Sequence, residues 1–244
     1  MARPDPMLGL DAIYVINVRA YEARRQHVTR ELARFGLRGE FVFDHDATDL
    51  TPETESPWFV PGAELRPGQK SCALKHMVVL ERIVERRQTR ALVLEDDVVL
   101  DAAFPDGVKA ALEEGGRWPE PKVTFLGSGG NFYTPRSRRV PGQRLYPATH
   151  GRFTDSYILG HDTATRRLAW IREHRMSKPV DNEFDRIDTA LGITMLWLED
   201  PVVEQGSKNG LFQSEVEPAP PPALQRLKFG WEKLRRKYLY QLWR

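Results

Sequence analysis

The segment that constrains this chain most is residues 91–100, an apolar run interrupted by three consecutive acids (ALVLEDDVVL). Runs of this composition form strands that are covered on both faces. Glu95, Asp96 and Asp97 bring three charges into such an interior, at high cost unless a partner compensates them. Because side chains alternate along a strand, we expect Glu95 and Asp97 on one face and Asp96 on the other. The first two predict a site for one hard divalent cation.

Oxygen ligands favour Mg²⁺ or Mn²⁺, and these ions keep part of their shell for water and substrate phosphates. The segment therefore favours a nucleotide-linked substrate. The alternative is a strand that ends at Leu94 and is followed by three solvated acids. The apolar residues Val98, Val99 and Leu100 argue against that alternative.

Composition narrows the classes of protein to which this chain can belong. Its 244 residues are 41% hydrophobic and 29% charged, values typical of a folded domain. The net charge of +2 gives no reason to expect a nucleic-acid partner. One cysteine excludes an internal disulfide and favours a reducing compartment. We find neither a secretory leader nor a membrane-spanning run, and we expect a cytoplasmic protein.

Apolar periodicity predicts alternating strands and helices. We expect strands at 13–18, 40–43, 91–100, 123–126, 157–159 and 193–198. We expect helices at 21–35, at 71–84, after a capping Asp162, and at 179–191. Residues 50–68 contain four prolines and predict an ordered loop that closes over a site, and residues 127–151 predict a long irregular region. This order predicts an α/β fold with a largely parallel central sheet.

The C-terminal part differs in composition from the rest. We expect one domain over residues 1–217, a proline-rich linker over 218–224 and a basic, aromatic-rich amphipathic helix over 225–244. Such a helix suits an anionic membrane surface. The alternatives are a helix packed on the domain with its charges solvated and, less favoured, an RNA-binding tail.

Several common site motifs are absent from the sequence. Residues 68–71 lack the first glycine of a phosphate-binding loop, and residues 127–129 are not a dinucleotide fingerprint. Paired cysteines, clustered histidines and a serine-nucleophile motif are also missing. Carboxylate chemistry around a metal ion remains.

Six blocks of the sequence together resemble a known family. They are residues 14–18 followed by a helix with Arg24, then 72–76, 91–98, 156–159, 179–181 and 201–205. In order and spacing they resemble glycosyltransferase family 25, which includes bacterial lipooligosaccharide galactosyltransferases and collagen galactosyltransferases. The resemblance implies a GT-A-type α/β/α sandwich with a mixed sheet, Mn²⁺ (or Mg²⁺) as the metal and a UDP-sugar as the donor.

The resemblance also implies roles for individual residues. Asp97 is the expected metal ligand, and Glu95 or Asp96 helps to orient the ribose or the ion. Asp181 is the expected base that takes the proton of the acceptor hydroxyl in an inverting transfer. The alternative for Asp181 is an N-cap of the helix that begins after Val180.

Three further residues are expected to contact the donor. Asn17 can read the nucleobase edge, Arg24 can reach the phosphate or the base, and His76 matches a histidine of the family. Their alternatives are satisfaction of backbone groups for Asn17, a solvated helix face for Arg24 and a buried structural role for His76. The chain departs from the family at Gln69 and Lys75, and Lys75 adds a positive charge beside the expected phosphate site.

These observations predict a cytoplasmic, metal-dependent enzyme that transfers a hexose, galactose first among the candidates, from a UDP-sugar to a saccharide of the cell envelope. Residues 225–244 are expected to hold it on the inner face of the membrane. A metal-dependent phosphohydrolase and a catalytically silent sugar-nucleotide-binding protein are the competing hypotheses. Release of phosphate from monoesters would indicate the first competitor, and UDP binding without turnover would indicate the second.

Overall fold

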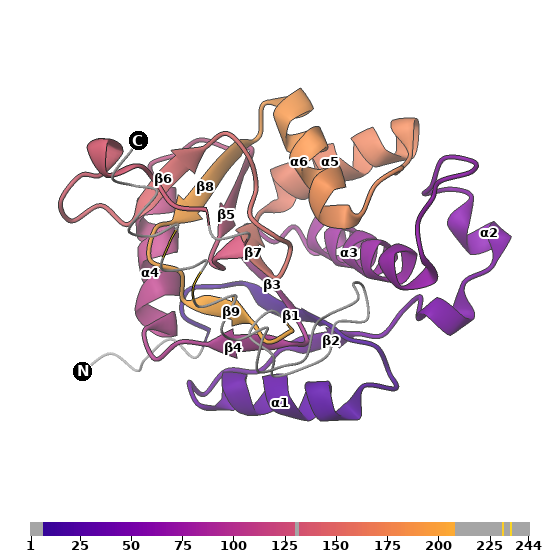
Figure 1. The fold of residues 1–244 in the computed structure, drawn as a ribbon, viewed down its shortest axis with the longest axis horizontal. Coiled ribbons are helices and arrows are strands. Elements are labelled where there is room, and N and C mark those ends of the chain that lie inside the picture. Colours follow the sequence, from indigo (N-terminus) through magenta and orange to yellow (C-terminus); the bar gives the residue numbers. More distant parts are fainter. Residues whose placement is uncertain (1–6, 130–131, 208–230, 232–234, 236–244) are drawn as a thin grey trace.

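One mixed sheet of seven strands forms the centre of the computed structural model (Figure 1). Residues 7–129, 132–207, 231 and 235 are the ones that the structure describes. The strands of the sheet are β1 (Ala12–Ile16), β2 (Glu40–Val42), β3 (Ala91–Glu95), β5 (Lys122–Phe125), β6 (Leu145–Ala148), β7 (Ser156–Leu159) and β8 (Thr194–Leu198). Their spatial order is β2-β1-β3-β7-β5-β8-β6.

Most of these strands run in one direction. β1 pairs in parallel with β2 and β3, and β5 pairs in parallel with β8. β7 is antiparallel to both β3 and β5, and β6 is antiparallel to β8. The carboxyl ends of β1 and β3 therefore lie at the same edge of the sheet as the start of β7.

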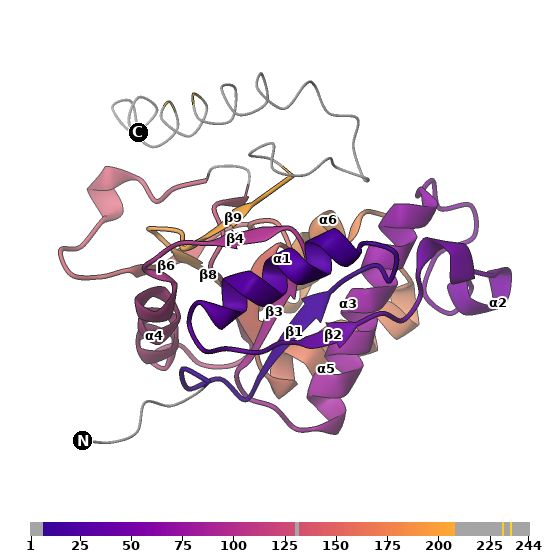
Figure 2. The ribbon, with the colours of Figure 1, turned by 90° about the horizontal axis from the view of Figure 1, so that it is seen from below.

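Helices cover both faces of the sheet (Figures 1 and 2). They are α1 (Glu22–Ala33) and α4 (Phe104–Gly115) on one face, and α3 (Pro67–Glu85), α5 (His161–His174) and α6 (Val180–Leu191) on the other. Along β1, Ile13 packs with the first layer and Tyr14 with the second, as strand alternation requires. The predicted α/β/α sandwich with a mixed sheet is confirmed.

The chain changes from one face of the sheet to the other between β1 and β3. The connection after β1 runs through α1 on one face, and the connection into β3 runs through α3 on the opposite face. In open α/β sheets, ligands bind outside the carboxyl ends of the strands at such a point. Asn17 directly follows β1 there, and Asp96 directly follows β3.

The predicted strand over 91–100 is broken in the middle. β3 ends at Glu95, and the chain turns at Asp96 and Asp97. The expectation that Glu95 and Asp97 share one face of a strand is therefore wrong. The alternative of solvated acids is wrong as well, because Asp96 and Asp97 are buried.

After the turn, the chain forms a small second sheet. β4 (Val98–Leu100) pairs antiparallel with β9 (Val203–Gln205). β4 rests on α1, where Nε2 of His27 lies 2.9 Å from the carbonyl oxygen of Val98. The backbone N–H of Leu100 donates to Oε2 of Glu31 at 2.8 Å. Residues far apart in the sequence thus enclose the acid turn.

Two segments that were predicted to be irregular contain short regular elements. α2 (Pro52–Glu55) lies within 50–68, and backbone hydrogen bonds of 2.7 and 3.0 Å join this segment to Met176, between α5 and α6. β6 lies within 127–151 at the edge of the sheet, where Pro147 is tolerated. That residues 50–68 close over a donor stays a prediction.

Two aspartates that were considered as helix caps lie inside the first turn instead. α5 begins at His161, so Asp162 is not its cap. α6 begins at Val180, so the N-cap alternative for Asp181 is wrong. Both carboxylates still lie where the dipole of the helix favours a negative charge.

The predictions for the C-terminal segment fall outside this description. The linker 218–224 and all of 225–244 except positions 231 and 235 lie outside the described residues. The basic helix and its membrane contact therefore stay predictions. Among the described residues, no helix has the length and the apolar composition needed to cross a membrane.

Candidate functional site

The three acids of the turn after β3 meet polar side chains from several other elements. The partners and neighbours are Asn17 after β1, Arg24 on α1, His76 on α3, Thr154 and Asp155 before β7, and Gln205 on β9. All of them gather where β1 and β3 end and β7 begins. The structure thus brings the predicted donor-binding residues and the three acids to one place.

Asp96 is held by two of the predicted donor-binding residues. Asn17 donates from Nδ2 to Oδ2 of Asp96 at 2.7 Å, and Arg24 donates from Nη1 to Oδ1 at 3.1 Å. Asn17 therefore does more than satisfy backbone groups, and Arg24 does not lie on a solvated helix face. Burial raises the pKa of the Asp96 carboxyl, and the Arg24 charge and the Asn17 hydrogen bond only partly offset this rise.

Glu95 is the last residue of β3 and has three polar neighbours. Thr154 donates from Oγ1 to Oε1 at 3.1 Å, and Gln205 donates from Nε2 to Oε2 at 3.3 Å. Nε2 of His76 lies 3.9 Å from Oε1. Burial acts to raise the pKa of Glu95, but these three neighbours outweigh it and lower the pKa. Glu95 therefore stays ionised at neutral pH.

Asp97 is fixed by residues just after β9. The backbone N–H of Ser207 donates to Oδ2 at 3.0 Å, and the N–H of Gly206 donates to the carbonyl of Asp97 at 2.7 Å. Oδ1 of Asp97 is buried and has no hydrogen-bond partner within the described ranges. Burial, and after it the charge of Glu95, raises the pKa of Asp97 to about 6. A buried carboxylate oxygen of this kind calls for a partner that the described part of the chain does not supply.

Asp155 is a site residue that the sequence did not predict. It is buried, directly precedes β7 and accepts a hydrogen bond from Oγ of Ser156 at 2.7 Å. Burial raises its pKa to about 8, and the charges of Glu95 and Asp97 add to the rise. The place of Asp155 in the site follows only from the topology of the sheet. Because β7 is antiparallel to β3, the start of β7 lies beside the end of β3.

His76 is fully buried and belongs to a series of polar contacts behind Glu95. Its Nδ1 lies 2.8 Å from the hydroxyl of Tyr157, and Arg167 stacks over the Tyr157 ring at 5.7 Å. Arg167 in turn donates to both oxygens of Asp188, at 2.8 and 2.5 Å. Burial lowers the pKa of His76 and keeps the ring neutral. These contacts favour the structural role of His76, and its contact with a donor stays a prediction.

Lys75 does not provide a free positive charge to the site. Its Nζ donates to Oδ1 of Asp46 and to the carbonyl of Asp44, both at 2.7 Å. The Lys75 side chain is 1% exposed. The ammonium therefore bonds to the segment after β2, and its place beside a phosphate stays a prediction.

Asp181, the predicted base, comes to the same end of the sheet. It lies in the first turn of α6, and its charge acts on the ionisation of both His76 and Cys72. Its Oδ1 accepts a hydrogen bond from the backbone N–H of Asn182 at 2.9 Å. The positive end of the helix dipole stabilises the anionic form that a base requires.

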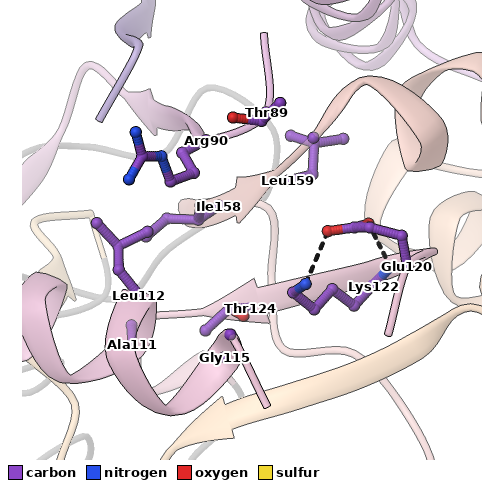
Figure 3. A pocket seen from close by; sticks show the side chains of 12 residues that line it. Thr89, Arg90, Ala111, Leu112, Gly115, Glu120, Lys122, Thr124, Ile158 and Leu159 are labelled. Carbon is purple, nitrogen blue, oxygen red and sulfur yellow. Dashed lines mark hydrogen bonds and ion pairs between the residues drawn. The ribbon is translucent and has the colours of Figure 1, made fainter. Parts of the chain in front are cut away.

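A small cavity of about 110 Å³ lies at the opposite ends of the strands from the acids, where β3 and β5 begin (Figure 3). Its wall combines Thr89 and Arg90, which precede β3, with Lys122 at the start of β5. An ion pair of 2.8 Å joins Lys122 to Glu120. Because β3 and β5 begin at this edge, the cavity shares no residue with the cluster of acids.

The oxygen ligands around Asp97 suit a hard divalent cation. Glu95, Asp97 and Asp155 offer only oxygen atoms, and burial, with the neighbouring negative charges adding to it, raises the pKa of Asp97 and of Asp155. Mg²⁺ and Mn²⁺ prefer oxygen ligands, and a bound cation would offset this repulsion. The buried Oδ1 of Asp97, which has no hydrogen-bond partner among the described residues, fits the metal that the resemblance implies.

Comparison with known proteins bears on the same region of the chain. A model of the family described as "Glycosyltransferase family 25 (LPS biosynthesis protein)" matches residues 10–129. The matched region contains β1, α1, α3 and the acid turn, and it stops shortly after β5. This part of the chain is therefore similar to glycosyltransferase family 25. The predicted resemblance is confirmed.

Individual proteins match the chain at low identity. A relative from Haemophilus influenzae is 26% identical over 180 residues, which are 71% of this chain and 61% of the relative. "Procollagen galactosyltransferase 2" of Mus musculus is 27% identical over 121 residues, 46% of this chain and 19% of the relative. "Inactive glycosyltransferase 25 family member 3" of Homo sapiens is 27% identical over 119 residues, 44% of this chain and 20% of the relative. The chain thus spans less than two thirds of the length of these relatives.

Solved structures resemble the chain only distantly. The apo form of mouse xyloside xylosyltransferase 1 gives a TM-score of 0.42 at 12% sequence identity, over 78% of this chain and 75% of that one. A CMP-2-keto-3-deoxy-manno-octonic acid synthetase complexed with CTP gives a TM-score of 0.38 at 12% identity, over 91% of this chain and 97% of that one.

Proposed function

We propose that this protein is a metal-dependent glycosyltransferase that transfers a hexose from a UDP-sugar to a saccharide acceptor. The observation that carries the proposal is the group of carboxylates at the carboxyl end of β3, in which Asp97 and Asp155 are buried beside Glu95, in a chain whose residues 10–129 match the family 25 model. The proposed hexose is galactose, which the name of the procollagen galactosyltransferase relative supports. The proposed acceptor belongs to the cell envelope, which the family description supports.

Asp97 and Glu95 are the proposed ligands of the divalent cation. The buried Oδ1 of Asp97, which lacks a hydrogen-bond partner among the residues that the structure describes, supports this role, as does the raised pKa of Asp155 beside it. When bound, the cation supplies Lewis-acid stabilisation of the departing nucleoside diphosphate. Thr154 and Gln205 hold the two oxygens of Glu95 in place for this purpose.

Asn17, Asp96 and Arg24 are proposed to hold the nucleoside part of the donor. A carboxylate has about four lone-pair sites, and each oxygen of Asp96 already accepts one hydrogen bond from Asn17 or Arg24. The remaining sites can accept from the hydroxyls of a ribose. Oδ1 of Asn17 is buried without a hydrogen-bond partner among the described residues, and it can accept from an N–H of the base.

Asp181 is the proposed base of an inverting transfer. The acceptor oxygen attacks the anomeric carbon of the donor sugar, and the bond from that carbon to the diphosphate oxygen breaks. The proton of the acceptor hydroxyl passes to the carboxylate of Asp181. The position of Asp181 in the first turn of α6, with its charge acting on His76, supports this assignment.

Calorimetric titration of UDP into the full chain tests the donor site. We expect binding with Mn²⁺, loss of binding with a chelator, and loss of binding in Asp97→Asn. Asp162→Asn, at the other edge of the sheet on α5, is the matched control and should bind like the wild type. Absence of UDP binding under every condition would overturn the proposal. A screen of UDP-sugars with saccharide acceptors then identifies the hexose.

A catalytically silent protein is the second candidate function. It is favoured by the name of the human relative, which describes an inactive family member. Mn²⁺-dependent UDP binding without release of UDP from any UDP-sugar, with or without acceptors, would support this candidate. Turnover that is lost in Asp181→Asn while UDP binding persists would support the enzyme instead.

Membrane attachment through 225–244 is a separate proposal that rests on composition. The segment is rich in basic and aromatic residues, which suit an anionic bilayer surface. We expect the full chain to sediment with vesicles that contain anionic lipid, and a chain without 225–244 to remain in solution. Equal binding by both chains would assign the segment a structural role.

A further inference from the structure

A sulfur, a nitrogen and an oxygen ligand meet on the α3 side of β3. Cys72 and His76 lie one turn apart on α3, and Glu95 ends β3 beside them. Their potential ligand atoms all lie within 4.8 Å of one another. Nε2 of His76 is 3.9 Å from Oε1 of Glu95, which is too long for a hydrogen bond. The three groups are close together without bonding to one another.

The imidazole of His76 is oriented for a ligand that the described residues do not provide. Its Nδ1 is held at 2.8 Å by the hydroxyl of Tyr157. Its Nε2 is fully buried and has no hydrogen-bond partner among the described residues. Histidines that bind metals have the other ring nitrogen held by a hydrogen bond in this way, which fixes the ring and the tautomer. With Nδ1 protonated and donating to Tyr157, the lone pair of Nε2 points at the cluster.

Glu95 is held in a similar way. Thr154 and Gln205 each donate to one of its oxygens, at 3.1 and 3.3 Å. Carboxylates that bind metals are likewise supported by hydrogen bonds from neighbouring groups. Two of the three groups therefore have the supporting contacts that a metal site requires.

We propose that Cys72, His76 and Glu95 bind a Zn²⁺-type divalent cation that ties α3 to β3. A thiolate, an imidazole and a carboxylate form a donor set that favours Zn²⁺ over Mn²⁺ or Mg²⁺. On binding, the thiol proton leaves to solvent, and the thiolate and the carboxylate together neutralise the two positive charges of the ion. Ligand atoms around a tetrahedral zinc lie about 3.4–3.8 Å apart, given its bond lengths, so small side-chain rotations complete the site.

This site goes beyond the proposed sugar transfer and differs from the oxygen-only set around Asp97. Glu95 lies between the two sets of metal ligands and can provide one oxygen atom to each. Three protein ligands leave a fourth position for solvent. Because Glu95 belongs to both sets, an ion at Cys72 and His76 would fix the carboxylate that the donor-binding cation also uses.

Cobalt absorption tests the proposal on the full, untagged chain. Co²⁺ bound to a thiolate gives a charge-transfer band in the near ultraviolet, and Cys72 is the one cysteine of the sequence. We expect the metal-free protein to develop this band with one equivalent of Co²⁺ and to lose it when Zn²⁺ is added. Cys72→Ser should abolish the band. His174→Gln, which removes an exposed histidine of α5, is the control and should not change it.

Two further variants separate this site from its surroundings. Tyr157→Phe removes the hydrogen bond to Nδ1 of His76 and should weaken Co²⁺ binding about 10- to 100-fold. Asp97→Asn should leave the band intact while it abolishes Mn²⁺-dependent UDP binding. The failure of either proposal is therefore distinguishable from the failure of the other. A band that disappears in Asp97→Asn would overturn the assignment to Cys72 and His76.

Alkylation of the thiol provides a second measurement on the unmodified protein. We expect Zn²⁺ to slow the reaction of Cys72 with iodoacetamide at least tenfold, whereas Mg²⁺ should have no effect. Absence of a charge-transfer band together with an unchanged alkylation rate in Zn²⁺ would overturn the proposal.

Discussion

Asn17 and Asp96 are 79 positions apart in the chain, yet a buried hydrogen bond of 2.7 Å joins them. The bond connects the residue after β1 to the residue after β3, at the point where the chain changes faces. It fixes the middle acid of the turn relative to the central sheet. Asn17, which the sequence analysis assigned to the donor, is therefore also a structural support of the site.

Asn17→Ala should lower both stability and donor binding. The variant leaves one buried oxygen of Asp96 without its donor, and a lost partner of this kind costs about 1–3 kcal/mol. Urea unfolding measures the loss. Asn182→Ala removes an exposed asparagine of α6 and serves as the control. Equal midpoints for Asn17→Ala and the wild type would show that the bond does not contribute in solution.

Lys75→Met should destabilise the protein without removing the donor site. The buried carboxylate of Asp46 would lose the ammonium that lies 2.7 Å away, and breaking one side of a buried pair costs about 3–5 kcal/mol. The double variant Lys75→Met with Asp46→Leu should recover much of that loss. If folded Lys75→Met lost UDP affinity while its stability was unchanged, Lys75 would be a phosphate ligand after all.

Asp188→Ala should be among the most destabilising single changes. Arg167 and Asp188 are each 1% exposed and join α5 to α6 through two hydrogen bonds. Removal of the carboxylate leaves a buried guanidinium without its anion, which costs about 3–5 kcal/mol. The free energy of unfolding in guanidinium chloride measures this cost. Asp162→Ala, in a part-exposed pair with Arg166, should cost less than about 1 kcal/mol.

Gly127→Ala should disturb the acid cluster by displacing Asp155. A Cβ at position 127 would lie 2.2 Å from Oδ1 of Asp155 and 2.8 Å from Oγ of Ser156. Overpacking of this kind costs about 1–3 kcal/mol. Gly68→Ala meets no atom within 4 Å in the first turn of α3, and it should leave the thermal midpoint unchanged or slightly raised. Similar midpoints for the two variants would contradict the close packing at Gly127.

Asp155 should make the stability of the metal-free protein depend on pH. Its carboxyl has a pKa of about 8 in the folded protein, against an ordinary value of 3.8 in the unfolded chain. Folding therefore takes up a proton between these two values, and the free energy of unfolding falls as the pH rises from about 4 to 8. In chelator, Asp155→Asn should flatten this decline in urea midpoints. An unchanged slope would show that Asp155 ionises freely.

Most apolar strands and the helices α1, α3, α5 and α6 were predictable from the sequence because their periodicity is local, whereas α4 was not predicted. The break in the strand after Glu95 was not predictable. Apolar residues continue past the acids, and the alternation of side chains cannot distinguish a strand from a tight turn. β6 was missed because four residues with Pro147 carry too weak a pattern. These differences come from contacts that only the folded chain brings together.

The candidate site, like the fold, was predictable from the sequence only in part. The acids were predicted from their types and spacing and Asp181 from the resemblance to family 25, whereas the contacts of Lys75 and Glu95 depend on partners far along the chain, and Asp155 was not predicted. Asp46 lies 29 positions from Lys75, and Glu95 lies 59 positions from Thr154. No spacing rule connects such pairs. The order and direction of the strands bring such residues together, and this topology cannot be read directly from a single sequence.

The pairing of β4 with β9 has a consequence for synthesis of the protein. β1, β2 and β3 can associate once the first hundred residues have left the ribosome, but β4 then has an open edge. Its partner, and the N–H groups of Gly206 and Ser207 that fix Asp97, emerge about a hundred residues later. Since chains fold as they are made, from the N-terminus onward, the acid turn is among the last parts of the molecule to take shape.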